Sequence, residues 1–145
     1  MSDETRNSAV DGTLPDKKYD LEERTTRFGE AIIEFANQVP GTPISDPLIR
    51  QLVRSATSIG ANYLEADDAG SKKEFRYRIS LCKREARETK YWLRMLAKAL
   101  PNFKEEARIH WREAKELHLI FQRFTTPNET QNPSKNNDRD GHVFV

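Results

Sequence analysis

Residues 71–100 read SKKEFRYRISLCKREARETKYWLRMLAKAL, and this stretch decides the fold. Mostly apolar residues recur along it at intervals of four and three, without a break: Phe75, Ile79, Cys82, Ala86, Thr89, Leu93, Leu96 and Leu100. This spacing places them in one seam along a single helix. At about 1.5 Å per residue the helix would be on the order of 45 Å long. Such a seam predicts packing against other helices in a bundle.

The same stretch is strongly basic. It holds ten Lys or Arg residues against three Glu, a net charge of +7 in a chain that is +1 overall. On a helix, one flank of the seam collects five of these cations: Arg76, Lys83, Arg87, Lys90 and Arg94. Arg84 and Lys98 lie further round. This charge predicts an anionic or acidic partner, and the alternative is a solvated face partly paired with Glu85 and Glu88.

Three further helical patterns accompany this one. Their seams consist of Leu21, Thr25, Phe28, Ile32, Phe35 and Val39; of Leu48, Leu52, Ala56, Ile59, Tyr63 and Ala66; and of Ala107, Trp111, Ala114, His118, Phe121 and Phe124. Capping signals at Asp20, Asp46 and Ser71 and the breaker at Pro101 predict helices near 20–39, 46–68, 71–100 and 103–124. No stretch alternates with period two, and the loops are short. The sequence therefore predicts an all-α, antiparallel up-down four-helix bundle.

Composition limits the other possibilities. A chain of 145 residues with 36% hydrophobic and 32% charged residues predicts one domain with a thin core, which subunit packing could complete. The single cysteine fits a reducing cytoplasm, and neither a signal peptide nor a membrane span is expected. The bundle should occupy 19–126, with disordered tails at 1–18 and 127–145. The last four residues, His142 to Val145, are apolar enough to dock somewhere.

Catalytic and metal-binding patterns are weak. His110 and His118 are eight residues apart, and no Glu lies three residues before a His, as a di-metal carboxylate bundle would need. Cys82 falls on the apolar seam and reads as a core residue. No phosphate-binding loop or nucleophile elbow is present. We expect no enzyme activity, no catalytic residue, no metal and no cofactor.

A polar line follows the second predicted helix. Arg54, Ser58, Asn62 and Glu65 lie four, four and three residues apart beside the apolar seam. This line predicts a hydrogen-bonded contact with another helix or subunit, and the alternative is an ordinary wet face. Arg50, one turn before Arg54, adds to the basic candidates.

Two segments carry a resemblance to a known family. Residues 54–65, RSATSIGANYLE, followed by Ser71-Lys72-Lys73-Glu74-Phe75, resemble the signature of the S23 or 23S rRNA-intervening-sequence proteins. Residues 85–93, EARETKYWL, look like a variant of that family's third helix, and the match covers roughly residues 20–124. The resemblance implies a left-handed four-helix bundle that assembles as a ring, typically a homopentamer. A related branch, the accessory protein of diversity-generating retroelements, binds reverse transcriptase and nucleic acid.

We therefore expect a non-catalytic, cytoplasmic homo-oligomer, a pentamer, that offers a basic surface to RNA, DNA or a nucleic-acid-handling protein such as reverse transcriptase. The candidate contacts are Arg50, Arg54, Arg76, Lys83, Arg84, Arg87, Lys90 and Arg94. The candidate family-motif and interface residues are Ser58, Asn62, Glu65, Glu85, Glu88 and Trp92. The alternative is a purely structural oligomer that binds no nucleic acid, in which the cations pair with Glu residues of adjacent helices.

Overall fold

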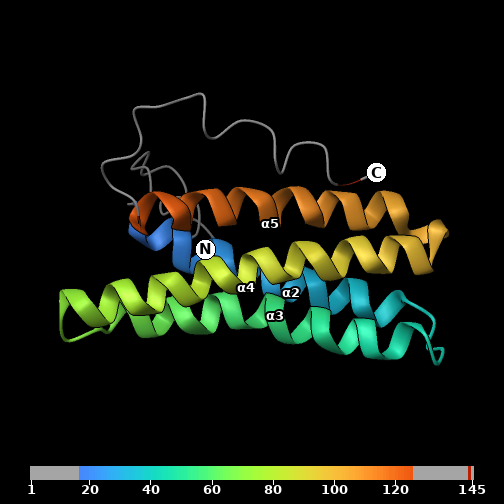
Figure 1. Cartoon of the computed structure of the whole chain (residues 1–145), viewed down its shortest axis with the longest axis horizontal. Helices are drawn as coiled ribbons and strands as arrows, with labels where there is room; N and C mark the ends of the chain where they lie inside the picture. The colour runs from blue at the N-terminus through green and yellow to red at the C-terminus, as the bar shows by residue number, and fades with distance from the viewer. Residues whose placement is uncertain (1–16, 126–143, 145) are drawn as a thin grey trace, which may run out of the picture.

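The computed structural model describes residues 17–125 and residue 144, with side chains from Leu21 onward. Within this part of the chain there are four α-helices and no strand. They are α2 (Lys17–Gln38), α3 (Ser45–Asp67), α4 (Lys72–Ala99) and α5 (Lys104–Thr125), with the short 3-10 helix η1 (Pro101–Phe103) before α5. Figure 1 shows successive helices running in opposite directions, with α4 between α3 and α5 and α2 behind. The all-α four-helix bundle is confirmed.

Two helix starts differ from prediction. The first helix, α2, begins at Lys17, so Asp20 lies inside it and is not its N-cap. The second helix, α3, begins at Ser45, one residue before the predicted cap at Asp46. Here the hydroxyl of Thr42 accepts hydrogen bonds from the backbone N–H groups of Ile44 at 3.2 Å and Ser45 at 2.9 Å. Thr42 therefore caps the N-terminus of α3, a role that the sequence pattern assigned to Asp46.

The start of α4 is as predicted. The hydroxyl of Ser71 accepts a hydrogen bond from the backbone N–H of Glu74 at 3.1 Å. The Glu74 carboxylate accepts one from the N–H of Gly70 at 3.2 Å. This arrangement is close to a capping box, with the return bond moved back by one residue. Pro101 follows the end of α4 at Ala99, again as predicted.

The predicted seams form the core. All six seam residues of α2 are buried, as are the central six of α4 from Ile79 to Leu96. Departures occur near the helix ends, where Leu48, Phe75 and Leu100 are half-buried and Phe124 is 43% exposed. Leu117, which is absent from the predicted seam of α5, is completely buried.

The helices are not equally close to one another. Contacts between backbones are extensive for α3 with α4 and for α4 with α5, fewer for α2 with α3, and sparse for α2 with α5. Aromatic side chains span the wider gap between α2 and the α5 side. The ring of Phe35 lies 6.2 Å from that of Phe103 and 5.1 Å from that of His110, between centroids.

The predicted tails, 1–18 and 127–145, lie outside the described residues, apart from Lys17 and Lys18, which are helical, and Phe144. None of the helices that the structure describes is long and apolar enough to cross a membrane.

Candidate functional site

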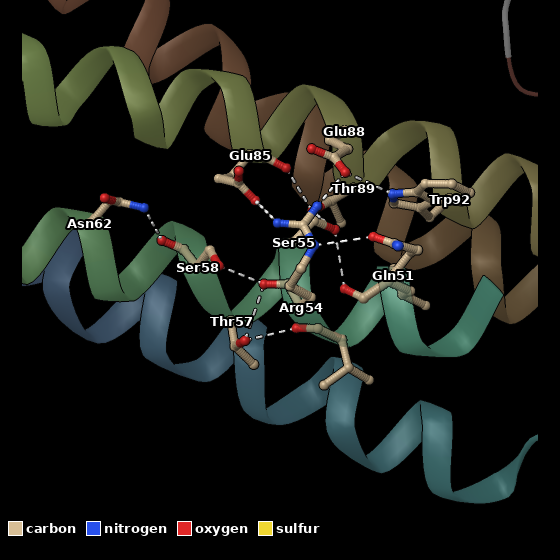
Figure 2. A network of polar contacts seen from close by, with 12 residues as sticks. Gln51, Arg54, Ser55, Thr57, Ser58, Asn62, Glu85, Glu88, Thr89 and Trp92 are labelled. Carbon is tan, nitrogen blue, oxygen red and sulfur yellow. Dashed lines mark hydrogen bonds and ion pairs between the residues drawn. The ribbon is translucent and has the colours of Figure 1, made fainter. Parts of the chain in front are cut away.

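An ion-pair network joins α3 to α4. The guanidinium of Arg54 lies between two carboxylates of α4, with Nη1 3.2 Å from Oε2 of Glu85 and Nη2 paired with Glu88. Its Nε donates to the side-chain oxygen of Gln51 at 3.1 Å, and the indole N–H of Trp92 donates to Glu88 at 3.1 Å. Figure 2 shows Arg54 reaching up from α3 between the two glutamates. We therefore place Arg54, a candidate nucleic-acid contact, within this network.

The two carboxylates respond differently to Arg54. Burial alone would raise the pKa of Glu88, but the hydrogen bonds from Trp92 and Arg54 outweigh it, so the pKa is lowered. For Glu85, whose side chain is only 14% exposed, burial prevails over the attraction of Arg54 and the pKa is raised. Burial opposes the charge of Arg54 as well, yet the two glutamates raise its pKa above the ordinary value. The network thus holds Arg54 charged and favours ionisation at Glu88.

The remainder of the predicted polar line stays on its own helix. Ser58 donates to the backbone oxygen of Arg54 at 2.7 Å, and Asn62 donates to that of Ser58 at 2.9 Å (Figure 2). Glu65 is exposed. Within this line, the side chain of Arg54 forms hydrogen bonds with α4. The contact between helices is thus seen at Arg54, and the interface role of Ser58, Asn62 and Glu65 stays a prediction.

The basic flank of α4 lies on its other side, toward α5. Arg76, Arg87 and Arg94 are exposed there, and Lys83 is half-buried. Arg84 is also exposed, but it lies further round α4, near Glu85 and Glu88. On α3, Arg50 is also exposed. Lys90 is different, since it is only 6% exposed and its Nζ lies 5.9 Å from the centroid of the Trp111 ring on α5. The flank thus begins at the α4–α5 contact and extends outward to solvent.

A second row of cations comes from α5. Lys104, Arg108, Trp111 and Lys115 follow one another at steps of four, three and four, so they share one side of the helix. The Nζ of Lys115 lies 5.6 Å from the Trp111 centroid, so the Trp111 ring is in contact range of a cation from each of the two helices. We call the cations that the two helices bring together here the α4–α5 basic cluster: Lys90, Arg94, Lys98, Lys104, Arg108 and Lys115.

Sequence reasoning did not find the α5 half of this cluster. Residues 104–125 contain five Lys or Arg and four Glu, so their net charge draws no attention. Two of these four Glu residues form ion pairs, one with α2 and one within α5. Glu113 pairs with Arg24 of α2 at 2.8 Å, and Glu105 lies 3.4 Å from Arg108. The spacing of the cations around Trp111 is the signal that could have shown the cluster.

A hollow opens at one end of the cluster. It has a volume of about 560 Å³ and is lined by Arg94, Met95, Ala97, Lys98, Pro101 and Lys104. Three of these six residues are cationic and none is acidic. Cations from the end of α4 and the start of α5 therefore surround a space open to solvent, which suits a phosphate group better than an uncharged ligand.

The nucleophile and metal candidates are poorly placed for chemistry. Cys82 is completely buried, its thiol donates to the backbone oxygen of Ile59 at 3.5 Å, and burial raises its pKa to about 12. His110 packs on Phe35, and burial lowers its pKa against the opposing effect of Glu106. Among the described residues, no group of three His, Cys, Asp or Glu side chains could hold a metal ion. The expectation that the protein has no enzyme activity stays a prediction.

These features define a small antiparallel four-helix bundle protein, with a polar network on one flank of α4 and a basic cluster on the other. The sequence pattern of the 23S rRNA-intervening sequence proteins matches residues 17–124, and the chain belongs to this family. The resemblance inferred from the motifs of the second and third helices is confirmed. The related retroelement accessory branch stays a prediction.

A solved structure agrees with this fold. It is the crystal structure of a protein of unknown function from the S23 ribosomal protein family of Bacteroides thetaiotaomicron, with a TM-score of 0.66 and 23% sequence identity. The alignment covers 77% of this chain and 99% of that one. At this identity the likeness supports the fold alone. A comparison with curated proteins finds no match.

Proposed function

We propose that this protein is a non-catalytic, homo-oligomeric bundle that binds nucleic acid through the phosphate backbone, along the α4–α5 side. The observation that carries the proposal is the α4–α5 basic cluster, in which cations of two helices meet. Isolated cations on a helix surface are common, whereas a cluster drawn from two helices creates a local positive potential. A polyanion that binds there releases condensed counterions, so its affinity falls as salt is added.

The exposed part of the cluster suits a backbone contact. Arg94 and Lys98 are exposed and one turn apart, and Lys104 faces the same hollow from α5. Arg87 and Arg76 extend the basic side along α4. Contacts of this kind recognise phosphate and do not read base edges, so we expect little sequence preference.

Exposed apolar side chains support the oligomer. Large hydrophobic residues are 43–67% exposed on the described helices or next to them: Ile33, Ile44, Leu64, Tyr77, Tyr91, Ile109 and Phe124. Those that fall within a contact between subunits would leave water on assembly. We propose a homopentamer, as the family resemblance implies, in a reducing cytoplasm. Reverse transcriptase is retained as a candidate partner on the same ground.

The test replaces three cations without altering the core. The triple variant Arg94→Gln, Lys98→Gln, Lys104→Gln removes the cations around the hollow. Its matched control, Arg50→Gln, Lys72→Gln, Lys73→Gln, removes the same charge from exposed positions at the start of α3 and α4. Binding of fluorescent RNA and DNA strands and duplexes is measured by anisotropy over a range of salt concentrations, and the assembly by analytical ultracentrifugation.

We expect the first variant to bind more weakly and to reduce the slope of log affinity against log salt by about two to three. The control should bind nearly as the unaltered protein does, and both should keep the native assembly. A purely structural oligomer is the competing function. It would be indicated if the unaltered protein bound no nucleic acid at low salt, or if the cluster variant lost its assembly along with binding.

A further inference from the structure

The ring of Phe144 lies on α5, although it comes from well beyond the end of that helix. Its centroid is 5.5 Å from that of Trp111, with the two ring planes at 41°. The guanidinium carbon of Arg108 lies 5.6 Å from the centroid of Phe144. The sequence indicates only that residues 142–145 are apolar enough to dock somewhere, and Phe144, the one of them that the structure describes, lies within the α4–α5 basic cluster.

Trp111 provides an aromatic surface among cations. The ammonium groups of Lys90 and Lys115 lie 5.9 and 5.6 Å from its centroid, and the side chain is 6% exposed with Phe144 in place. Proteins that bind single-stranded nucleic acid combine these two elements, an aromatic ring for the bases and cations for the phosphates. Phe144 is only half-buried. The Trp111 ring is therefore covered on one side by a side chain that solvent can reach.

We propose that the Trp111 surface is a binding site for a flat aromatic ring, which Phe144 fills in the free protein and an unpaired nucleobase fills in the complex. This inference rests on the proposed function, because it assumes that the basic cluster holds the phosphates. A base in the position of Phe144 has Arg108 beside its ring, and Lys115 is close enough to meet a flanking phosphate. Bases in a duplex are stacked and paired, so they cannot enter.

Phe144 is then an internal competitor of single strands. While it occupies the site, the apparent affinity for a single strand is lowered by the fraction of molecules that are closed. An aromatic pair of this kind contributes enough for removal of the Phe144 ring to raise the affinity about two- to tenfold. Duplex binding uses the exposed cations alone and should not change.

The experiment uses Trp111 as its own reporter. The chain has two tryptophans, so Trp92→Phe in the full chain leaves Trp111 as the sole source of tryptophan emission. In this background Phe144→Ala is compared with Phe124→Ala, which removes an exposed ring from α5 away from the Trp111 site. Each protein is titrated with oligothymidylate and with a duplex of equal length, and both anisotropy and Trp111 emission are recorded.

We expect Phe144→Ala to change the emission of the free protein and to raise the affinity for oligothymidylate two- to tenfold. Oligothymidylate should quench Trp111, whereas the duplex should bind without quenching, and Phe124→Ala should alter none of these results. If oligothymidylate binds without quenching Trp111, and Phe144→Ala leaves its affinity unchanged, the inference is overturned while the proposed function stands. A lower affinity in Phe144→Ala overturns it too, and an absence of all binding overturns both.

Discussion

The hydroxyl of Thr89 on α4 donates a hydrogen bond of 2.9 Å to the hydroxyl oxygen of Ser55 on α3, and both side chains are completely buried. The Ser55 hydroxyl lies 3.2 Å from the backbone oxygen of Leu52, to which it donates in turn (Figure 2 shows the Ser55–Thr89 pair beside Arg54). This is a short chain of polar groups inside an otherwise apolar contact. Such a chain fixes how α3 and α4 are aligned, because an apolar contact could slide and this one cannot without losing the bond.

Removing both hydroxyls should therefore destabilise the fold by less than the two single removals added together. We expect Ser55→Ala to lower the free energy of unfolding by about 1 kcal/mol, since Thr89 can fall back on the backbone oxygen of Glu85 at 2.8 Å. The double variant Ser55→Ala, Thr89→Val should be less destabilised than the sum of the two single variants. Urea unfolding of the four proteins measures the coupling, and strict additivity would show that the bond contributes nothing.

Arg54 should contribute more to the stability of the fold than its partly exposed side chain suggests. Replacing it with Ala leaves Glu85 and Glu88 without the cation that lies between them, and we expect a loss of about 1–2 kcal/mol, reduced by high salt. The control is Arg50→Ala, an exposed arginine one turn earlier, which should change stability by less than about 0.5 kcal/mol. Equal effects of the two substitutions in thermal unfolding would contradict a specific role for the network.

The stability of the fold should depend on Glu88 in a pH range that follows from its lowered pKa. Between the lowered native value and the ordinary value of 4.5, the unfolded chain binds more protons than the native one. Stabilisation by Glu88 is therefore complete above that ordinary value and is lost as the pH falls through the native value. The gap in stability between the unaltered protein and Glu88→Gln should be widest near neutral pH and should close in acid.

Glu85 gives the opposite trend and serves as the control for Glu88. Because its native pKa is raised, protonation of Glu85 favours the folded state. The unaltered protein should therefore gain stability relative to Glu85→Gln as the pH falls. Parallel pH profiles for the two variants would show that the network does not separate the two carboxylates.

Cys82 should be almost unreactive in the folded protein. With a pKa of about 12 instead of 9.0, its thiolate fraction at pH 8 is lower by a factor on the order of 1,000, before burial limits access. Reaction with a disulfide reagent such as DTNB should be slower by at least this factor than in urea, where the thiol is free. Rapid modification of the native protein would mean that the core between α3 and α4 opens readily.

The buried face of each helix could be predicted, because it follows from the three- and four-residue spacing of apolar residues along that helix alone. Ile79, Cys82, Ala86 and Leu93 are buried for that reason. Helix starts were less predictable, since capping signals compete. Thr42 and Asp46 are both suitable residues, and the choice depends on the turn, in which Ser45 donates to the backbone oxygen of Pro40.

The basic cluster could be predicted only in part. The pattern on α4 gives the flank on which Lys90 and Arg94 lie, but it does not tell which helix that flank faces. That depends on how the helices are ordered around the core, a long-range property. Once α5 is placed beside α4, Lys90 of α4 and Lys115 of α5 both lie within 6 Å of the Trp111 ring centroid. The carboxylates of Glu85 and Glu88 lie off this flank, where they pair with Arg54 of α3.

The unequal spacing of the helices has a consequence for how the protein moves. Helices α3 and α5 each pack closely on α4, whereas α2 is attached mainly through α3 and through the rings around Phe35. The opening of lowest free energy should therefore release α2 and leave a three-helix unit. In native-state hydrogen exchange, amides in the middle of α2 should exchange through this partial unfolding, while those of α4 should wait for global unfolding.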